Sequence, residues 1–221
     1  MLSTIKSLAK ALRRNNSGVA LTEFAVIAPV FLTLGMGGFE VAHMATSNMK
    51  TSQIAMSVAD NASRLGQTDN NAVAPTITET DVDAVLQGAL QQGKSIDLEA
   101  NGRVILSSLE MDQISGKQYI HWQRCAGDGT TDSAYGNETN KNGLTGSHSL
   151  AGMGKAPNVV TAPVGTAVMY VEVHFTYNPV FLSPFGKVAN FVEEAAFIVR
   201  DDRDIGERNE KGLSGTKQNS C

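Results

Sequence analysis

The chain has 221 residues, of which 42% are hydrophobic and 18% are charged. This composition excludes an intrinsically disordered chain and a polytopic membrane protein. The chain has two cysteines, too few for a disulfide-dense scaffold or for a zinc site made of four cysteines. Its net charge of −4 does not indicate nucleic-acid binding. We therefore expect one domain of ordinary size with an appendage.

The charge is unevenly distributed along the chain. Residues 1–18 contain four basic side chains and no acid, whereas the rest of the chain holds 14 Lys and Arg against 22 Asp and Glu. A basic head on an acidic body, with an apolar run between them, is typical of a membrane-targeted protein.

The apolar run extends from Val19 to Phe39 and is interrupted by one charge, that of Glu23. A helix needs about 20 residues to cross the hydrocarbon core, so we predict a transmembrane helix over residues 19–43. The positive-inside rule places Met1 in the cytoplasm and the chain beyond about Met44 outside. From the residues alone, one interpretation of this segment is an uncleaved signal anchor whose Glu23 reaches the membrane interface.

Two features around the start of this run resemble a type IV prepilin processing site: a basic pair before Gly18, and a glutamate, Glu23, as the fifth residue after it. The longer stretch from Gly18 to Met44 resembles the N-terminus of the TadE-like family of pseudopilins, minor components of the Flp (Tad) pilus system. The matching features are Gly18, Glu23-Phe24-Ala25, Pro29 in mid-helix and a second acid, Glu40, just beyond the span.

The resemblance implies a prepilin peptidase that cuts between Gly18 and Val19 and removes a basic leader, residues 1–18. It implies that Glu23 pairs with the new N-terminal amine of a neighbouring subunit. A charge pair of this kind sets register in an assembly even where its net stabilisation is small. Phe24, Pro29 and Glu40 are then candidates for helix packing or for a second acidic contact.

The resemblance also implies where the protein acts and with what. The partners would be the prepilin peptidase, other minor pilins and the inner-membrane assembly platform, with the major pilin as a further candidate. The protein would be a single-pass protein of the bacterial inner membrane, with its N-terminus cytoplasmic and its C-terminal domain periplasmic or extracellular; its incorporation into the pilus stays open. It would function in assembly or priming of a pilus used for surface adherence, with no cofactor.

Beyond the span we expect the helix to continue as an amphipathic stalk over residues 44–66, followed by a linker over residues 67–78. We expect an α+β domain over residues 67–200, in which the long helix packs on an antiparallel sheet in a pilin-like arrangement, and a polar tail over residues 201–221. The predicted elements are a helix from Asp81 to Gln92 capped by Thr80, and the strands Arg103–Met111, Lys117–Cys125, Thr166–Tyr177 and Glu194–Arg200.

We find no catalytic motif and no metal motif. None of the four histidines belongs to a metal-binding pattern, and we expect His121 and His174 to be exposed sheet residues. We predict that residues 126–165 form a long surface loop. Trp122 is either a core residue packed on the long helix or a surface anchor, and the segment Val180–Phe191 is a subunit contact, a membrane-surface contact or a hydrophobic turn.

Two alternatives to the pseudopilin remain: a signal-anchored binding or adhesin domain, and a membrane-anchored enzyme. The sequence also leaves two possible states for the cysteines, bonded to each other or free. Both fall on the predicted outer side of the membrane, where disulfides persist, so we predict a Cys125–Cys221 bond, against the alternative of two free thiols.

Overall fold

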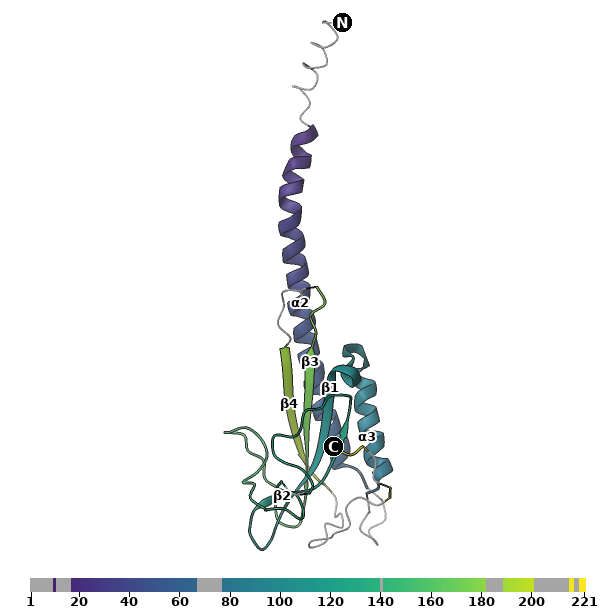
Figure 1. Ribbon diagram of the computed structural model, residues 1–221, viewed down its shortest axis with the longest axis vertical. Helices are drawn as coiled ribbons and strands as arrows, with labels where there is room; N and C mark the ends of the chain where they lie inside the picture. The colour runs from purple at the N-terminus through teal and green to yellow at the C-terminus, as the bar shows by residue number, and fades with distance from the viewer. Residues whose placement is uncertain are drawn as a thin grey trace. The chain divides into compact units, whose positions relative to one another are not determined.

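The computed structural model describes residues 10, 17–66, 77–139, 141–181, 189–200, 215–216 and 219–221. Contacts divide the chain into two compact units, Met1–Met44 with Pro179–Lys187, and Ala45–Asn178 with Val188–Cys221. The elements, shown in Figure 1, are the helices α2 (Ser17–Ser63), α3 (Glu79–Gln92), η1 (Gly93–Ile96) and α4 (Leu98–Asn101), and the strands β1 (Gly102–Met111), β2 (Gln118–Ala126), β3 (Val168–Tyr177) and β4 (Ala189–Ile198).

The predicted fold class, α+β with a long N-terminal helix, is confirmed. The helix α2 is continuous through Pro29, and its C-terminal part, from Ala45 onward, belongs to the second unit. There it buries a face that recurs at helical spacing and consists of Ile54, Ala55, Val58, Ala59 and Ala62. The stalk is therefore amphipathic, as its pattern predicts.

All neighbouring strands of the sheet are antiparallel, in the order β2-β1-β3-β4. Three of the predicted strands correspond to β1, β2 and β3 within one or two residues. The fourth was wrong in its limits: β4 begins at Ala189 rather than Glu194 and ends at Ile198. β4 pairs with β3 over its whole length, from Tyr177↔Ala189 to Val168↔Ile198. This pairing extends the strand over polar residues whose own propensity disfavours a strand.

One face of the sheet forms the main core with the C-terminal part of α2 and with α3 (Figure 1). Its buried members include Leu86 from α3, Leu106 from β1, Trp122 from β2 and Val171 from β3. Trp122 is 6% exposed, so of its two interpretations the structure supports the core residue packed with the long helix.

The helix α3 begins two residues earlier than predicted, and Thr78 caps it rather than Thr80. The Thr78 hydroxyl accepts a hydrogen bond from the Asp81 N–H, and the Asp81 carboxylate accepts one from the Thr78 N–H. This reciprocal capping box uses the acid three residues after Thr78. Thr80 is also followed by an acid at that spacing, Asp83, but Thr80 lies inside the helix.

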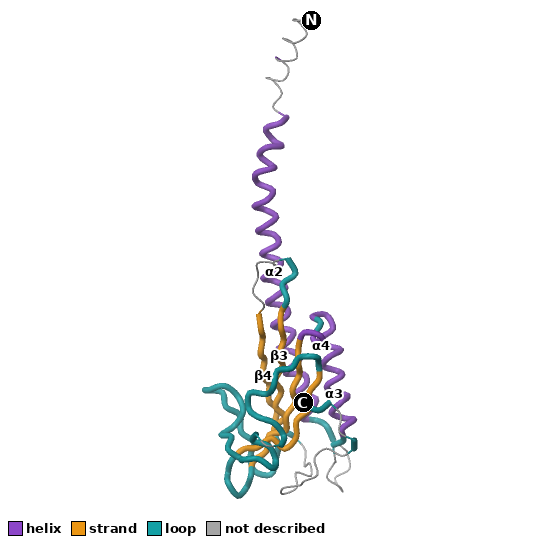
Figure 2. Tube along the Cα trace, viewed as in Figure 1, coloured by secondary structure: helices purple, strands orange, loops and turns teal. Residues whose placement is uncertain are grey.

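The residues that join β2 to β3 form neither helix nor strand where the structure describes them, as expected (Figure 2). They are not all at the surface, however. Met153 is fully buried, in a second cluster with Leu109, Ile120 and Tyr170. The connection therefore covers part of the sheet, because β-strand residues outside the main core need their own apolar contacts.

Five predicted segments lie partly outside the described residues; in the predicted loop over residues 126–165, residue 140 is not described. The leader is described at Lys10, Ser17 and Gly18, and the linker from Ile77 onward. Residues 182–188 of the apolar segment, and residues 201–214 and 217–218 of the tail, are not described.

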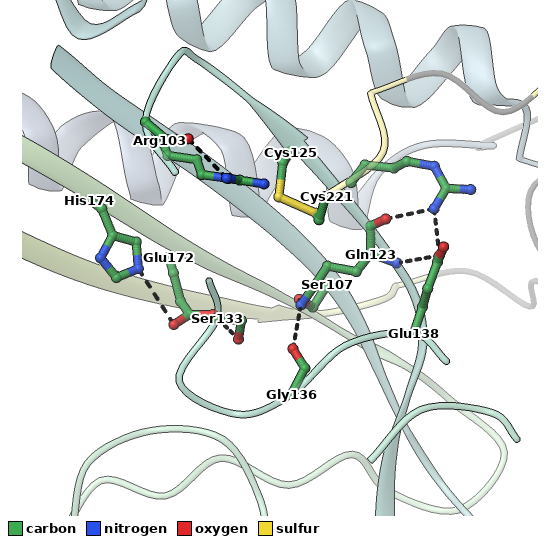
Figure 3. Close-up of a disulfide and its surroundings, with 12 residues drawn as sticks. Arg103, Ser107, Gln123, Cys125, Ser133, Gly136, Glu138, Glu172, His174 and Cys221 are labelled. Carbon is green, nitrogen blue, oxygen red and sulfur yellow. Dashed lines mark hydrogen bonds and ion pairs between the residues drawn. A yellow bond between two sulfur atoms is a disulfide. The ribbon is translucent and has the colours of Figure 1, made fainter. Parts of the chain in front are cut away.

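The structure contains a disulfide between Cys125, in β2, and Cys221, the last residue (Figure 3). The Cα atoms are 5.0 Å apart, and the Cys125 N–H donates to the Asn219 carbonyl at 2.8 Å. A sequence separation of 96 residues means that the bond closes a loop around most of the second unit.

A Cys125→Ser/Cys221→Ser variant should lose up to about 4 kcal/mol of unfolding free energy, because the bond restricts the unfolded chain across a long loop. Urea unfolding of the full chain in detergent, with and without the substitutions, measures the loss. Thiol titration of the denatured, non-reduced parent protein checks the bond itself, and two titratable thiols would contradict it.

Candidate functional site

The N-terminal part of α2, in the first unit, exposes a continuous apolar surface. Phe24, Phe31 and Leu34 are each about 70% exposed. Monomeric soluble proteins rarely expose contiguous apolar surface on this scale. Among the described residues, α2 is the one helix that is long and apolar enough to cross a membrane.

The residues implied by the prepilin resemblance lie along this helix. Gly18 and Val19 are in its first turn, and Glu23 and Phe24 follow one turn later, all of them exposed. Glu23 makes no hydrogen bond or ion pair with another residue that the structure describes. A carboxylate in this setting is available to a group outside the chain.

Pro29 lies inside the helix and lacks the N–H that a helix interior normally uses. One turn later, the Thr33 hydroxyl donates to the carbonyls of Pro29 and Val30, both at 2.9 Å. These bonds keep the hydroxyl satisfied within the helix, which an apolar environment requires.

Glu40 differs from Glu23, because it is 6% exposed and has partners within the first unit. Its carboxylate accepts hydrogen bonds from the N–H groups of Val180 (3.1 Å to each oxygen) and Phe181 (2.9 Å). The Phe39 and Phe181 rings meet edge to face, with centroids 5.4 Å apart. The sequence singles out Glu40 as a second acid, but no local signal pairs it with a segment 140 residues away.

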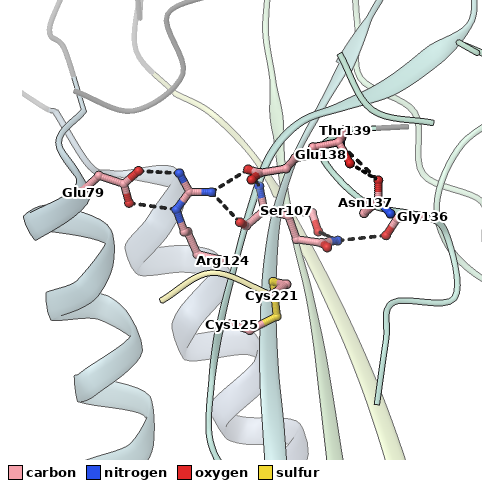
Figure 4. A network of polar contacts seen from close by, with 10 residues as sticks. Glu79, Ser107, Arg124, Cys125, Gly136, Asn137, Glu138, Thr139 and Cys221 are labelled. Carbon is pink, nitrogen blue, oxygen red and sulfur yellow. Dashed lines mark hydrogen bonds and ion pairs between the residues drawn. A yellow bond between two sulfur atoms is a disulfide. The ribbon is translucent and has the colours of Figure 1, made fainter. Parts of the chain in front are cut away.

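A second polar cluster, in the second unit, joins three segments through one guanidinium (Figure 4). Arg124 of β2 makes two hydrogen bonds to Glu79 in the first turn of α3, one of them at 2.8 Å, and one to Glu138 at 2.6 Å. Burial disfavours the charged form of Arg124, but the two carboxylates outweigh it and raise its pKa. The cluster holds α3 and the β2–β3 connection on the same strand.

The expectation that His121 is exposed was wrong. The register of β1 and β2 shifts between Ser108 and Leu109, whose partners are Trp122 and Ile120. His121 lies at this bulge, where simple alternation fails, and its Nδ1 is 2.8 Å from the Glu110 carboxylate in a buried site. His174 is also largely covered, with 15% of its side chain exposed.

Among the described residues there is no group of three or more His, Cys, Asp and Glu side chains that could hold a metal. The buried Arg124 cluster is closed by hydrogen bonds among its own residues, so it fits a structural role.

The comparisons with known proteins bear on the same helix. A family model described as TadE-like protein matches residues 18–64. No curated protein and no solved structure matches the chain. The resemblance recognised in the sequence is therefore confirmed for residues 18–64, which cover almost the whole of α2. The apolar helix on which the match falls fits a single-pass membrane anchor.

An Arg124→Met variant should lose about 3–5 kcal/mol of unfolding free energy, because it leaves the Glu79 carboxylate buried without its cation. Urea unfolding of the full chain in detergent measures this loss. The matched control is Arg64→Met, which removes an exposed i,i+4 ion pair with Asp60 and should cost less than about 1 kcal/mol. Equal losses for the two variants would contradict the structural role of Arg124.

Proposed function

We propose that this protein is a minor pilin, or pseudopilin, that takes part in assembling or priming a Flp (Tad) pilus used for surface adherence. It acts by association with other subunits rather than by catalysis. The observation that carries the proposal is the TadE-like match on a helix whose apolar side chains are exposed.

The physical argument starts from that helix. Side chains such as Phe24, Val26 and Phe31 need an apolar environment, and one chain does not provide it. A bilayer supplies this environment before assembly, and the helices of neighbouring subunits supply it in a pilus. A single helix that fits both environments is what a protein that moves from membrane to filament requires.

Glu23 provides the specificity. A carboxylate in an apolar helix is costly unless a positive group meets it. Cleavage after Gly18 would create such a group, the α-amine of Val19, and the amine of one subunit would pair with Glu23 of the next. Other minor pilins, the membrane platform and the peptidase are the partners that this mechanism needs, with the major pilin as a further candidate.

A Gly18→Trp variant should accumulate as an uncut precursor, because a peptidase pocket that accepts glycine has no room for an indole. The intact mass of the membrane-extracted protein measures the cut directly. For the parent chain we expect a mature protein that begins at Val19. A mature protein that keeps Met1, or that begins near Thr46, would contradict the pseudopilin assignment.

A Glu23→Gln variant should be inserted and cut normally, yet fail to support piliation or to co-purify with its partner pilins. Removing one partner of a desolvated charge pair costs about 3–5 kcal/mol, enough to disrupt an assembly equilibrium. The matched control is Thr22→Ser, which keeps a hydroxyl one position away on the same helix. Normal piliation by a fully expressed Glu23→Gln protein would show that this charge does not drive assembly.

A further inference from the structure

The inference concerns the turn after β3, residues 179–181, which belongs to the same compact unit as the N-terminal part of α2. The backbone N–H groups of Val180 and Phe181 bind the Glu40 carboxylate with three contacts of 2.9–3.1 Å. Glu40 directly follows the apolar run, which ends at Phe39. The turn is therefore tethered to the point of α2 where the apolar run ends.

Three of the side chains around this tether are apolar and exposed, and the His43 ring stacks on one of them, Phe39. Phe39, Val180 and Phe181 are 53%, 52% and 44% exposed, although Phe39 and Phe181 contact each other edge to face. The carboxylate between them is 6% exposed and directed at backbone donors. The tethered turn thus presents hydrophobic groups outward and keeps its charge inward, the reverse of an ordinary surface turn.

A membrane interface accounts for this inversion. Aromatic side chains are favoured at the level of the lipid headgroups, where a transmembrane helix leaves the bilayer. A carboxylate at that level loses part of its water, and hydrogen bonds from backbone N–H groups to the ionised form offset the loss. The exposed surface of the turn is also continuous with the apolar surface of α2, so both suit the same surroundings.

We propose that the tethered turn, formed by Phe39, Glu40, Val180 and Phe181, is a membrane-interface anchor. The three apolar side chains insert among the headgroups and upper acyl chains of the leaflet where α2 emerges, and Glu40 holds the turn in place. The anchor gives the helix a second attachment to the lipid and fixes its depth. This inference rests on the membrane placement in the proposed function.

A single-tryptophan experiment on the full-length chain tests the anchor. Trp122, the one tryptophan of the sequence, is first removed as Trp122→Phe, and Phe181→Trp is then added as the reporter. The protein is reconstituted into phosphatidylcholine–phosphatidylglycerol vesicles that contain lipids brominated at shallow or at deep acyl positions. We expect blue-shifted emission, quenched more by the shallow than by the deep bromines.

Two reporters calibrate the result. Phe31→Trp, in the middle of the apolar run, should be quenched best by the deep bromines, whereas Ile114→Trp, in the exposed β1–β2 turn, should not be quenched. If Phe31→Trp is quenched and Phe181→Trp is no more quenched than Ile114→Trp, the anchor is overturned while the membrane span stands. If Phe31→Trp is not quenched either, the membrane placement itself is overturned.

Emission of Phe181→Trp that is blue-shifted, unquenched and dependent on protein concentration would mean that a second copy covers the turn, which also overturns the anchor. Val180→Trp serves as an independent reporter if Phe181→Trp does not fold.

The tether has its own variant. Adding Glu40→Ala to the Phe181→Trp protein should remove most of the shallow quenching, because the turn loses its acceptor. The matched control, Glu99→Ala, removes an exposed carboxylate far along the sequence and should leave the quenching unchanged. Full quenching in the Glu40→Ala protein would overturn the role of Glu40.

Discussion

The exposed apolar surface on the first half of α2 is the constraint on which the rest of the structure depends. Each large side chain left in water forgoes about 1.5–3 kcal/mol, so this helix needs lipid or other helices around it. A helix meets that need without unpaired backbone groups in its interior, and the Thr33 hydroxyl bonds back to the helix for the same reason. Farther along, the same helix buries one face against a sheet, so one element serves both as anchor and as part of the core.

The two acids that flank the apolar run are treated differently. Glu40 is buried and hydrogen-bonded to backbone groups of its own unit, which satisfies its charge within the chain. Glu23 is exposed on the helix, and none of the described residues pairs with it. In the proposed assembly Glu40 therefore acts in the fold of the subunit, and Glu23 acts between subunits. Arg124, in the second unit, resembles Glu40 in this respect, because the two carboxylates that pair with it belong to the same chain.

Local sequence signals predicted the elements whose causes are local. The apolar run and the helical spacing of Ile54 and Val58 predicted α2, and alternation with β-branched residues predicted most of the sheet. The errors arose where distant contacts decide. A bulge between β1 and β2 places His121 in a buried site. Pairing with β3 makes β4 longer than its own sequence predicts. The Glu40 contact could not be predicted for the same reason, since its donors come from the turn after β3, 140 residues away in the sequence.

The most direct test of this account is the accessibility of the middle of the apolar run in membranes. A Phe31→Cys variant and a Ser115→Cys variant, the latter in the β1–β2 turn, are treated with a membrane-impermeant maleimide in fragmented membranes, with the parent chain as the blank. We predict that Ser115→Cys is labelled at once in the native membrane, where Phe31→Cys is not labelled. Phe31→Cys becomes labelled once denaturing detergent has dissolved the bilayer and unfolded the protein. Equal labelling of the two cysteines in the native membrane would contradict the account.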